Sequence, residues 1–137
     1  MSDHSFEGLT RRPSVHDHLG VEIVEVSPER VVLTLEVGPK AHQPFGLLHG
    51  GISALLAESA ASIGATVCVW PNEVAVGTEL NCSHLRSMRD GTLTATARPL
   101  RKGQRVHVWS IDLTDDEGHL ICAARCSLQI LPAPSAT

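Results

Sequence analysis

Hydrophobic and polar residues alternate along two stretches near the start of the chain. In the second stretch, Val31, Leu33 and Leu35 fall on one side, and the residues between them fall on the other. A period of two is typical of a β-strand with one buried face. Because a Ser-Pro-Glu turn separates the stretches, the pattern predicts a hairpin of strands over 21–27 and 30–37.

One long helix is predicted over Gly50–Val69, where small and apolar residues dominate and helix formers occupy the middle. At about 100° per residue, two sides of this helix are apolar or small. A helix of this composition is expected to be buried on nearly every side. One side carries Ile52, Leu56, Ile63 and Val67, and the other carries Gly51, Leu55, Glu58, Ser62 and Ala65.

Four further strand-like segments follow, separated by turns rich in Gly, Asp and Lys. The order β-β-α-β-β-β-β predicts an α+β fold, in which an antiparallel sheet wraps around one central helix. Since such a sheet covers only one side of the helix, a second subunit is expected to cover the other. A short helix is expected before the sheet, with Ser14 as its N-cap and Gly20 at its end. The predicted segments are the short helix Val15–Leu19 and the strands 73–85, 91–101, 105–113 and 119–131.

The length of 137 residues corresponds to one domain. We expect this domain at 14–131, after a flexible N-terminus (1–13) and before a disordered tail (132–137). A hydrophobic content of 42% excludes an intrinsically disordered chain. The net charge of −4 and the 3% of aromatic residues argue against nucleic-acid binding. No apolar run approaches the roughly 20 residues of a membrane span, so no membrane partner is expected.

The four cysteines, Cys68, Cys82, Cys122 and Cys126, lack the C-x-x-C spacing of zinc ribbons and redox motifs. We expect them to be buried free thiols. The N-terminal residues contain no apolar signal-peptide segment, so the protein is expected in the cytoplasm, where disulfides are rare.

The segment His-Gln-Pro-Phe-Gly-Leu-Leu-His-Gly-Gly, at 42–51, carries the first candidate chemistry. Gly50 and Gly51 begin the helix, where uncovered backbone N–H groups and the helix dipole favour an anion or an oxygen that becomes anionic during a reaction. The alternative is a plain glycine start to the helix. Gln43 and His49 precede the glycine pair on the loop.

Glu58 lies in the middle of the helix among apolar residues, where burial of a carboxylate is costly unless it is paired or used. Burial would favour its protonated form and poise it as a base or nucleophile. Ser62, one turn later on the same face, could bond to the carboxylate or orient a water molecule. The alternatives are an exposed or arginine-paired Glu58 and a Ser62 that only permits packing. No metal is expected, because the sequence lacks His-Glu-x-x-His and other ligand spacings.

The block Gln-Pro-Phe-Gly-Leu-Leu-His-Gly-Gly, followed by Leu-Leu-Ala-Glu-Ser, resembles the hotdog-fold acyl-CoA thioesterases. Within this phenylacetate-pathway-like superfamily, the chain is most similar to the 4-hydroxybenzoyl-CoA thioesterase branch. That branch includes the bacterial thioesterases of menaquinone synthesis, which act on 1,4-dihydroxy-2-naphthoyl-CoA, and of enterobactin synthesis. The resemblance runs from about Val15 to Leu131. A related branch has Asp at the position of Glu58.

The resemblance implies hydrolysis of an acyl-CoA thioester with an aryl- or enoyl-type acyl group. Glu58 matches the carboxylate that acts as nucleophile or general base, and Gly50 matches the N–H that polarises the thioester carbonyl. Gln43 and His49 match residues that position the thioester and thiolate, and Ser62 matches the hydroxyl that holds water. No cofactor is implied, because coenzyme A is part of the substrate. The resemblance also implies a homodimer with shared active sites, paired again as a homotetramer.

Contacts to coenzyme A are implied at two places. His84 and Arg86 match positions that contact substrate or coenzyme A. The turn at 100–105 resembles the loop that meets the CoA nucleotide, where cations bind a pyrophosphate or 3′-phosphate. The alternative is that these charges are simply exposed to solvent at the turn. Gln104 and Arg105 stand where family members have small hydroxyl side chains. The turn residues concerned are Arg101, Lys102, Gly103, Gln104 and Arg105.

Two other functions use similar groups. A hotdog dehydratase or hydratase also polarises a carbonyl and uses a histidine and a carboxylate. Its pattern has a proline-rich loop after the histidine, whereas glycines follow His49 here. A non-catalytic hotdog dimer that binds acyl-CoA is the third reading, and the presence of Glu58 and Ser62 argues against it.

Overall fold

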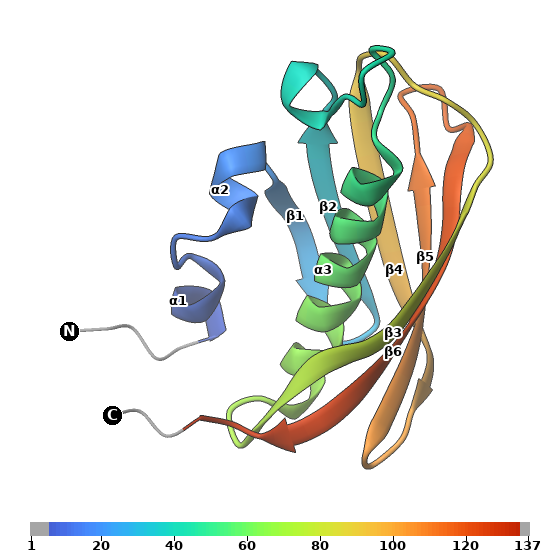
Figure 1. Cartoon of the computed structure of the whole chain (residues 1–137). Helices are drawn as coiled ribbons and strands as arrows, with labels where there is room; N and C mark the ends of the chain where they lie inside the picture. Colours follow the sequence, from blue (N-terminus) through green and yellow to red (C-terminus); the bar gives the residue numbers. More distant parts are fainter. Residues whose placement is uncertain (1–5, 135–137) are drawn as a thin grey trace.

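The computed structural model describes residues 6–134. A six-stranded antiparallel sheet curls around one long helix, α3 (Gly50–Val69), as Figure 1 shows. The strand order across the sheet is β1-β2-β4-β5-β6-β3. The predicted α+β architecture and the bounds of α3 are therefore confirmed. The strands are β1 (Glu22–Ser27), β2 (Arg30–Glu36), β3 (Glu73–His84), β4 (Thr92–Lys102), β5 (Val106–Thr114) and β6 (Leu120–Pro132), and a 3-10 turn, η1, covers Pro39–Ala41.

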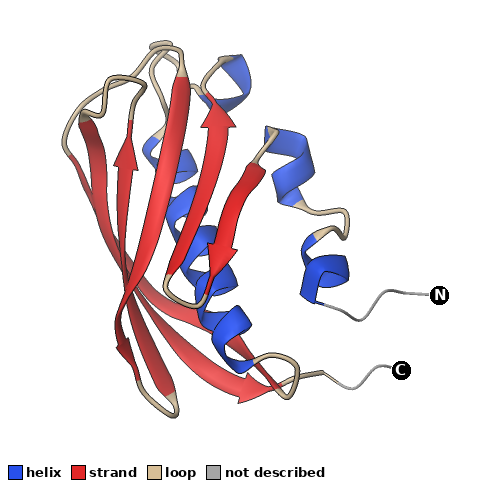
Figure 2. Ribbon diagram, turned by 180° about the vertical axis from the view of Figure 1, so that it is seen from behind, coloured by secondary structure: helices blue, strands red, loops and turns tan. Residues whose placement is uncertain are grey.

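Two short helices, α1 (Phe6–Thr10) and α2 (Val15–Leu19), precede the sheet (Figure 2). The predicted ends of α2 are confirmed: the Ser14 hydroxyl accepts from the His16 N–H, and Gly20 ends the helix with φ 72°. The sequence predicted no helix before Ser14, so α1 corrects that expectation. Its Phe6 ring packs edge-on against the ring of Trp70, at 6.2 Å between centroids, and a contact this distant in sequence leaves no local pattern.

The end of the sheet also differs from the prediction. Strand β6 ends at Pro132, one residue inside the segment that we expected to be a disordered tail. Residues 135–137 of that tail lie outside the described residues.

The face of α3 that packs on the sheet consists mostly of small residues. Its buried positions repeat at intervals of three and four, and all but one of the apolar ones are alanine or glycine. This differs from the two sides assigned from sequence, because Ile52, Ile63 and Val67 are only half-buried. Small side chains let the helix axis approach the sheet closely. The buried apolar positions are Leu56, Ala57, Ala60, Ala61, Gly64 and Ala65.

Trp109, on β5, fills the space that Gly64 leaves. The indole is fully buried, and an ideal Cβ on Gly64 would lie 2.5 Å from its Cη2 atom. The indole N–H donates to Nδ1 of His107, which is also buried, at 3.3 Å. Burial lowers the pKa of His107, so the neutral imidazole is favoured as the acceptor.

Helix α3 is long and apolar enough, judged by length and composition alone, to cross a membrane. It has 20 residues with a mean hydropathy of 1.6, so the statement that no apolar run approaches this length was wrong. Half of this stretch is buried inside the molecule, where the helix packs against the strands of the sheet. Its composition is therefore explained by its position in the core.

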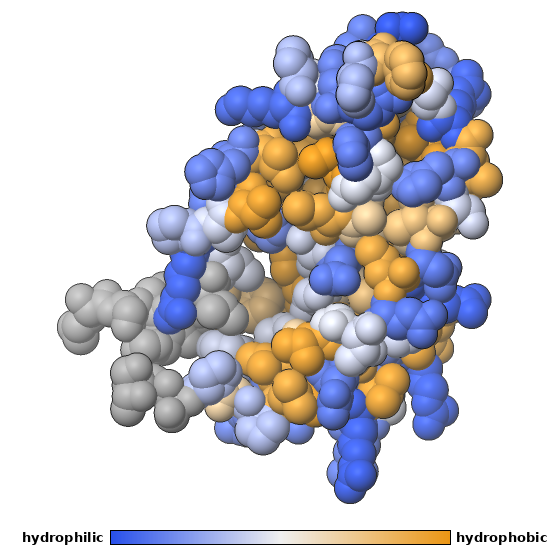
Figure 3. All heavy atoms as spheres, viewed as in Figure 1, coloured by the Kyte–Doolittle hydropathy of each residue, from blue (hydrophilic) through white to orange (hydrophobic). Residues whose placement is uncertain are grey.

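The part of α3 that the sheet does not cover lies beside a free sheet edge. Strand β3, 12 residues long, pairs only with β6 and therefore presents unpaired backbone groups on its other side. On α3, Gly51 and Glu58 are exposed, and Leu55 is half-buried. Figure 3 shows apolar side chains gathered on the face where α3 lies in Figure 1. An open edge beside an uncovered apolar face is typical of a surface that a second chain covers.

The four cysteines are free thiols, but their burial differs. Cys122 and Cys126 are buried as predicted, whereas Cys68 and Cys82 are only half-buried. Burial raises the pKa of Cys122 to about 12 and that of Cys126 to about 11. These two thiols are therefore poor nucleophiles.

The contact between Gly64 and Trp109 predicts the effect of an added methyl group. Gly64→Ala should destabilise the protein by about 1–3 kcal/mol, because the methyl group overlaps the indole. Helix propensity alone would change stability by about 1 kcal/mol in the opposite direction. In a Trp109→Leu background, where the ring is absent, the penalty should disappear. Urea denaturation of the wild type, the two single variants and the double variant separates the steric penalty from the effect of helix propensity. A Gly64→Ala variant more stable than the wild type would contradict the packing.

Candidate active site

His49 caps the N-terminus of α3. Its Nδ1 atom accepts a hydrogen bond from the Gly51 N–H at 2.8 Å, and its carbonyl accepts from the Ile52 N–H at 2.9 Å. An ideal Cβ on Gly51 would lie 2.9 Å from Nδ1, so the imidazole lies directly against the helix backbone. His49 thereby orients the first turn of the helix.

The backbone N–H of Gly50 remains available at this helix end. Within residues 6–134, no carbonyl or side chain accepts a hydrogen bond from it. The imidazole of His84 lies beside it, since an ideal Cβ on Gly50 would be 3.0 Å from Nε2 of that ring. An unpaired N–H at the positive end of a 20-residue helix, next to an imidazole, can bind an oxygen that gains negative charge.

The loop before α3 is fixed by backbone hydrogen bonds. The Gln43 N–H donates to Leu47 O at 2.8 Å, and the His49 N–H donates to Ala41 O at 2.8 Å. The Gln43 side-chain oxygen accepts from the Phe45 N–H, which leaves the side-chain amide N–H groups free to donate to a ligand. The loop therefore holds the Gln43 amide in a defined position near the helix start.

Four of the predicted site residues surround one cavity of about 430 Å³. Gly50 begins α3, and Gln43 lies on the loop before it. His84 is the last residue of β3, and Arg86 follows that strand. The cavity is large enough for an extended ligand, since ligand pockets usually span about 300–1,000 Å³. The predicted residues that line it are Gln43, Gly50, His84 and Arg86.

Glu58 lies outside this cavity, about two turns further along α3. An ideal Cβ on Gly77 of β3 would lie 3.0 Å from the Glu58 Cδ atom, so the carboxylate rests on the glycine of the free edge strand. The pairing of β3 with β6 is irregular between Gly77 and Glu79. In the single chain Glu58 is exposed, which corresponds to the alternative reading from sequence and not to the expected burial.

Ser62 is half-buried and lines a second cavity, of about 240 Å³, between α3 and the N-terminal helices. It therefore lies on the far side of Glu58 from Gly50. Ser62 nevertheless follows Glu58 on the helix by only one turn.

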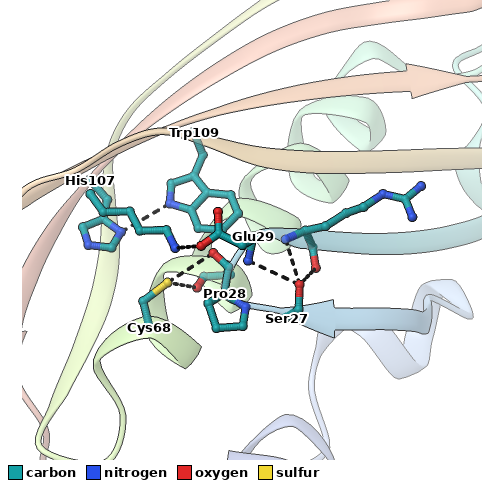
Figure 4. A network of polar contacts seen from close by, with 9 residues as sticks. Ser27, Pro28, Glu29, Cys68, His107 and Trp109 are labelled. Carbon is teal, nitrogen blue, oxygen red and sulfur yellow. Dashed lines mark hydrogen bonds and ion pairs between the residues drawn. The ribbon is translucent and has the colours of Figure 1, made fainter.

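The turn between β4 and β5 lies at the opposite end of α3 from Gly50 (Figure 1). Lys102 forms an ion pair with Glu29 there. The thiol of Cys68, in the last turn of α3, donates to the carbonyls of Pro28 and Gly64; Figure 4 shows this network. The contact with Glu29 raises the pKa of Lys102. Since α3 is about 28 Å long, this turn does not line the cavity at Gly50 of the same chain. Arg101, Gln104 and Arg105 are exposed at the turn, and the Gly103 N–H donates to Val106 O at 2.9 Å.

Known proteins are similar to this chain in sequence and fold. The chain is 45% identical, over 116 residues, to a 1,4-dihydroxy-2-naphthoyl-CoA hydrolase of Listeria monocytogenes, covering 85% of this chain and 94% of that protein. It is 35% identical to the proofreading thioesterase EntH of Cronobacter turicensis, covering 84% of each. A solved thioesterase structure from Haemophilus influenzae matches with a TM-score of 0.88 and 34% identity, covering 96% of this chain and 94% of that one. Residues 45–122 match the thioesterase superfamily.

The chain belongs to the thioesterase superfamily. The hotdog fold and the thioester-hydrolase class expected from the Gly-Leu-Leu-His-Gly-Gly block are confirmed. The match begins at Phe45, on the loop that carries this block, and therefore includes the helix start and Glu58.

Two residues of this candidate site were missed from sequence. Ser53 is almost fully buried and lines the larger cavity, one turn after Gly50. Its position on the core side of α3 becomes evident only when the sheet is in place. Gly77 was detectable, because an isolated glycine in a strand often marks a bulge or a close approach. Within the described part of the chain, no group of three or more His, Cys, Asp or Glu side chains could hold a metal ion.

The contact of Gly77 with the Glu58 carboxylate predicts a loss of turnover in this thioesterase. A methyl group at position 77 would displace the carboxylate, and if Glu58 is the reacting carboxylate, a 1 Å shift of it can cost roughly 100-fold in rate. Gly77→Ala should therefore lower kcat for thioester hydrolysis by about 10- to 100-fold, with KM little changed. Gly38→Ala is the matched control, because nothing lies within 4 Å of its added methyl group. Equal kcat values for the two variants would show that Gly77 does not position Glu58.

Proposed function

We propose that the protein hydrolyses acyl-CoA thioesters, with an aryl- or enoyl-type acyl group, to the free acid and coenzyme A. The observation that carries this proposal is the unpaired backbone N–H of Gly50 at the start of α3. Gly50 lines a cavity together with Gln43 and His84. The Listeria relative, whose name specifies a naphthoyl-CoA substrate, supports the aryl-type acyl group.

The reaction uses the groups at the two ends of this helix segment. The thioester carbonyl accepts from the Gly50 N–H, which stabilises the negative charge that develops on the oxygen. Glu58 attacks the carbonyl carbon directly, or removes a proton from a water that Ser62 orients. The carbon–sulfur bond breaks, the acyl carbon gains a hydroxyl group from water, and the remaining proton goes to the thiolate. Gln43 and His49 position the thioester and the leaving thiolate.

The proposal requires a shared active site. Glu58 lies roughly 11 Å along the helix axis from Gly50, which is too far for both to reach one carbonyl. Two β3 edges joined around a two-fold axis would set two α3 helices antiparallel and bring Gly50 of one subunit opposite Glu58 of the other. The free β3 edge and the uncovered face of α3 support this homodimer. Pairing of two dimers gives the proposed homotetramer.

The same symmetry brings the β4–β5 turn of one subunit toward the cavity of the other. With antiparallel helices, the C-terminal end of one α3 lies at the same end as Gly50 of its partner. Arg86 within one subunit, and Arg101 or Arg105 across the interface, would then meet the phosphates of coenzyme A. Lys102 is the weakest candidate, because Glu29 already neutralises it.

The protein is proposed to act in the cytoplasm. Its four free cysteines support this location, because thiols persist in a reducing compartment.

Glu58→Gln tests the chemistry directly. It keeps the size of the side chain and removes the base, so kcat should fall by at least ~100-fold while KM and the fold are little changed. Ser62→Ala should cost less, because the water can be held in part by other groups. Release of free thiol from benzoyl-CoA measures both effects. Full activity of Glu58→Gln would contradict the proposed mechanism. Hydration of crotonyl-CoA by the same samples would show that the protein is a hydratase.

The shared geometry has its own test. A heterodimer of Glu58→Gln and Gly50→Val subunits retains one intact pairing, so mixing the two inactive proteins should restore up to one working site per dimer. A different affinity tag on each subunit, with two successive purifications, isolates the mixed dimers. Absence of activity in verified heterodimers would contradict the shared site and leave the role of Glu58 intact.

Arg86→Ala should raise KM for CoA esters more than it lowers kcat. A phosphate contact is the same in the ground state and the transition state, so its loss weakens binding without changing turnover. Lys102→Ala should have a smaller effect on KM, since Lys102 is paired with Glu29. Steady-state kinetics of Ala variants at Arg86, Arg101, Lys102 and Arg105 give the comparison. Unchanged KM in all four would refute the proposed phosphate contacts.

A further inference from the structure

Ser53 is a polar residue of α3 that the proposed reaction does not use. Only 1% of the residue is exposed, and it lines the cavity of about 430 Å³ that Gly50 and His84 also line. Within residues 6–134, the Ser53 hydroxyl has no hydrogen-bond partner, although its backbone N–H donates to His49 O at 3.4 Å. Because burial of an unpaired hydroxyl is costly, such a group in a cavity wall points to a ligand.

The exposed part of Ser53 is its hydroxyl. Among the described residues, every side-chain oxygen or nitrogen that is fully shielded from solvent has a hydrogen-bond partner. Since the Ser53 hydroxyl has no partner, it is not fully shielded, and the small exposed area of this residue includes it. Ser53 lines the cavity, so its hydroxyl faces the space in which a ligand would lie.

The polar groups around this cavity differ in what they can bind. The Gly50 N–H and the free amide N–H groups of Gln43 can only donate, so they suit an oxygen of the ligand. The Ser53 hydroxyl can also accept, so it suits a ligand N–H. The other lining side chains that can accept, those of His84 and Ser87, are exposed. Ser53 is therefore the buried acceptor of this cavity.

The spacing of Gly50 and Ser53 fits one part of an acyl-CoA ester. Ser53 follows Gly50 by three residues, so it lies roughly 4.5 Å further along the axis, at a neighbouring position on the helix surface. In such an ester, a sulfur and two methylene groups join the carbonyl carbon to the nearest amide nitrogen, a reach of roughly 5 Å. With hydrogen bonds of about 3 Å at each end, an ester whose carbonyl accepts from Gly50 can present that amide N–H to Ser53.

We propose that Ser53 binds the pantetheine arm of coenzyme A: its hydroxyl accepts a hydrogen bond from the amide N–H nearest the thioester sulfur. This inference rests on the proposed thioester hydrolysis. The contact gives a buried partner to an amide that loses its water on binding. From there the arm continues toward Arg86, the proposed phosphate contact, which lines the same cavity.

Two benzoyl thioesters that differ in one group test the contact. One is the ester of N-acetylcysteamine, which carries the amide, and the other is its ketone analogue, in which a methylene group replaces the amide N–H. The wild type should have a kcat/KM about 5- to 10-fold higher for the amide ester, because the ketone leaves the Ser53 hydroxyl unpaired. In Ser53→Ala, which has no acceptor, this ratio should fall to about 1.

The loss in Ser53→Ala should appear in KM for the amide ester, because the contact is the same in the ground state and the transition state. A purely structural role would lower kcat/KM equally for both esters and leave the ratio as in the wild type. A wild-type ratio near 1, or a wild-type ratio retained in Ser53→Ala, would overturn the proposed contact.

Ser110→Ala is the matched control. Ser110 is half-buried on β5, and its side chain lies on the opposite face of the sheet from the fully buried Trp109 and Ile111. The control variant should keep the wild-type ratio of kcat/KM.

Calorimetry with coenzyme A separates this inference from the proposed function. Ser53→Ala should bind coenzyme A about 5- to 10-fold more weakly than the wild type, whereas Ser110→Ala should bind as the wild type does. A wild-type protein that hydrolyses neither ester would overturn the proposed function. The Kd values would still decide the contact, because equal values for the wild type and Ser53→Ala would overturn it.

Discussion

The close packing of α3 against the sheet determines the rest of this structure. Gly64 lies against the indole of Trp109 with no room for a methyl group, and alanines flank it on the same face. Because the helix can approach the sheet so closely, the sheet curls around it and leaves one side of the helix bare. That bare side carries Glu58 and adjoins the free β3 edge. The geometry that builds the core therefore also exposes the groups that we propose for catalysis.

A single rigid helix places the proposed reacting groups at fixed intervals. Gly50 at its start offers an unpaired N–H beside His84, Glu58 follows about two turns later on Gly77, and Ser62 opens onto the second cavity. A helix cannot bend enough to bring its start to its middle, so Gly50 and Glu58 of one chain cannot act on the same carbonyl. This separation is the physical reason for proposing catalysis across a two-fold axis.

Much of the fold was predictable from local pattern. The strand alternation, the bounds Gly50–Val69, and the caps Ser14 and Gly20 follow from neighbours within a few residues of one another. The motif at the helix start likewise indicated the family, because its glycines, histidine and carboxylate are close in sequence. Helix α1 was not predictable, since the contact between Phe6 and Trp70 joins distant segments. The half-burial of Cys68 and Cys82 also depends on distant neighbours.

The sequence by itself determined which residues could act: a helix that begins with two glycines, a single carboxylate in its middle, and a serine one turn later. Only the tertiary structure decided where these residues lie relative to other segments. It placed His84 beside Gly50, Glu58 against Gly77, and Ser62 in one cavity with the N-terminal helices. It also put Lys102 against Glu29 at the far end of α3. The reason is physical: the order of residues sets periodicity and caps, whereas the curl of the sheet around α3 sets which distant side chains meet.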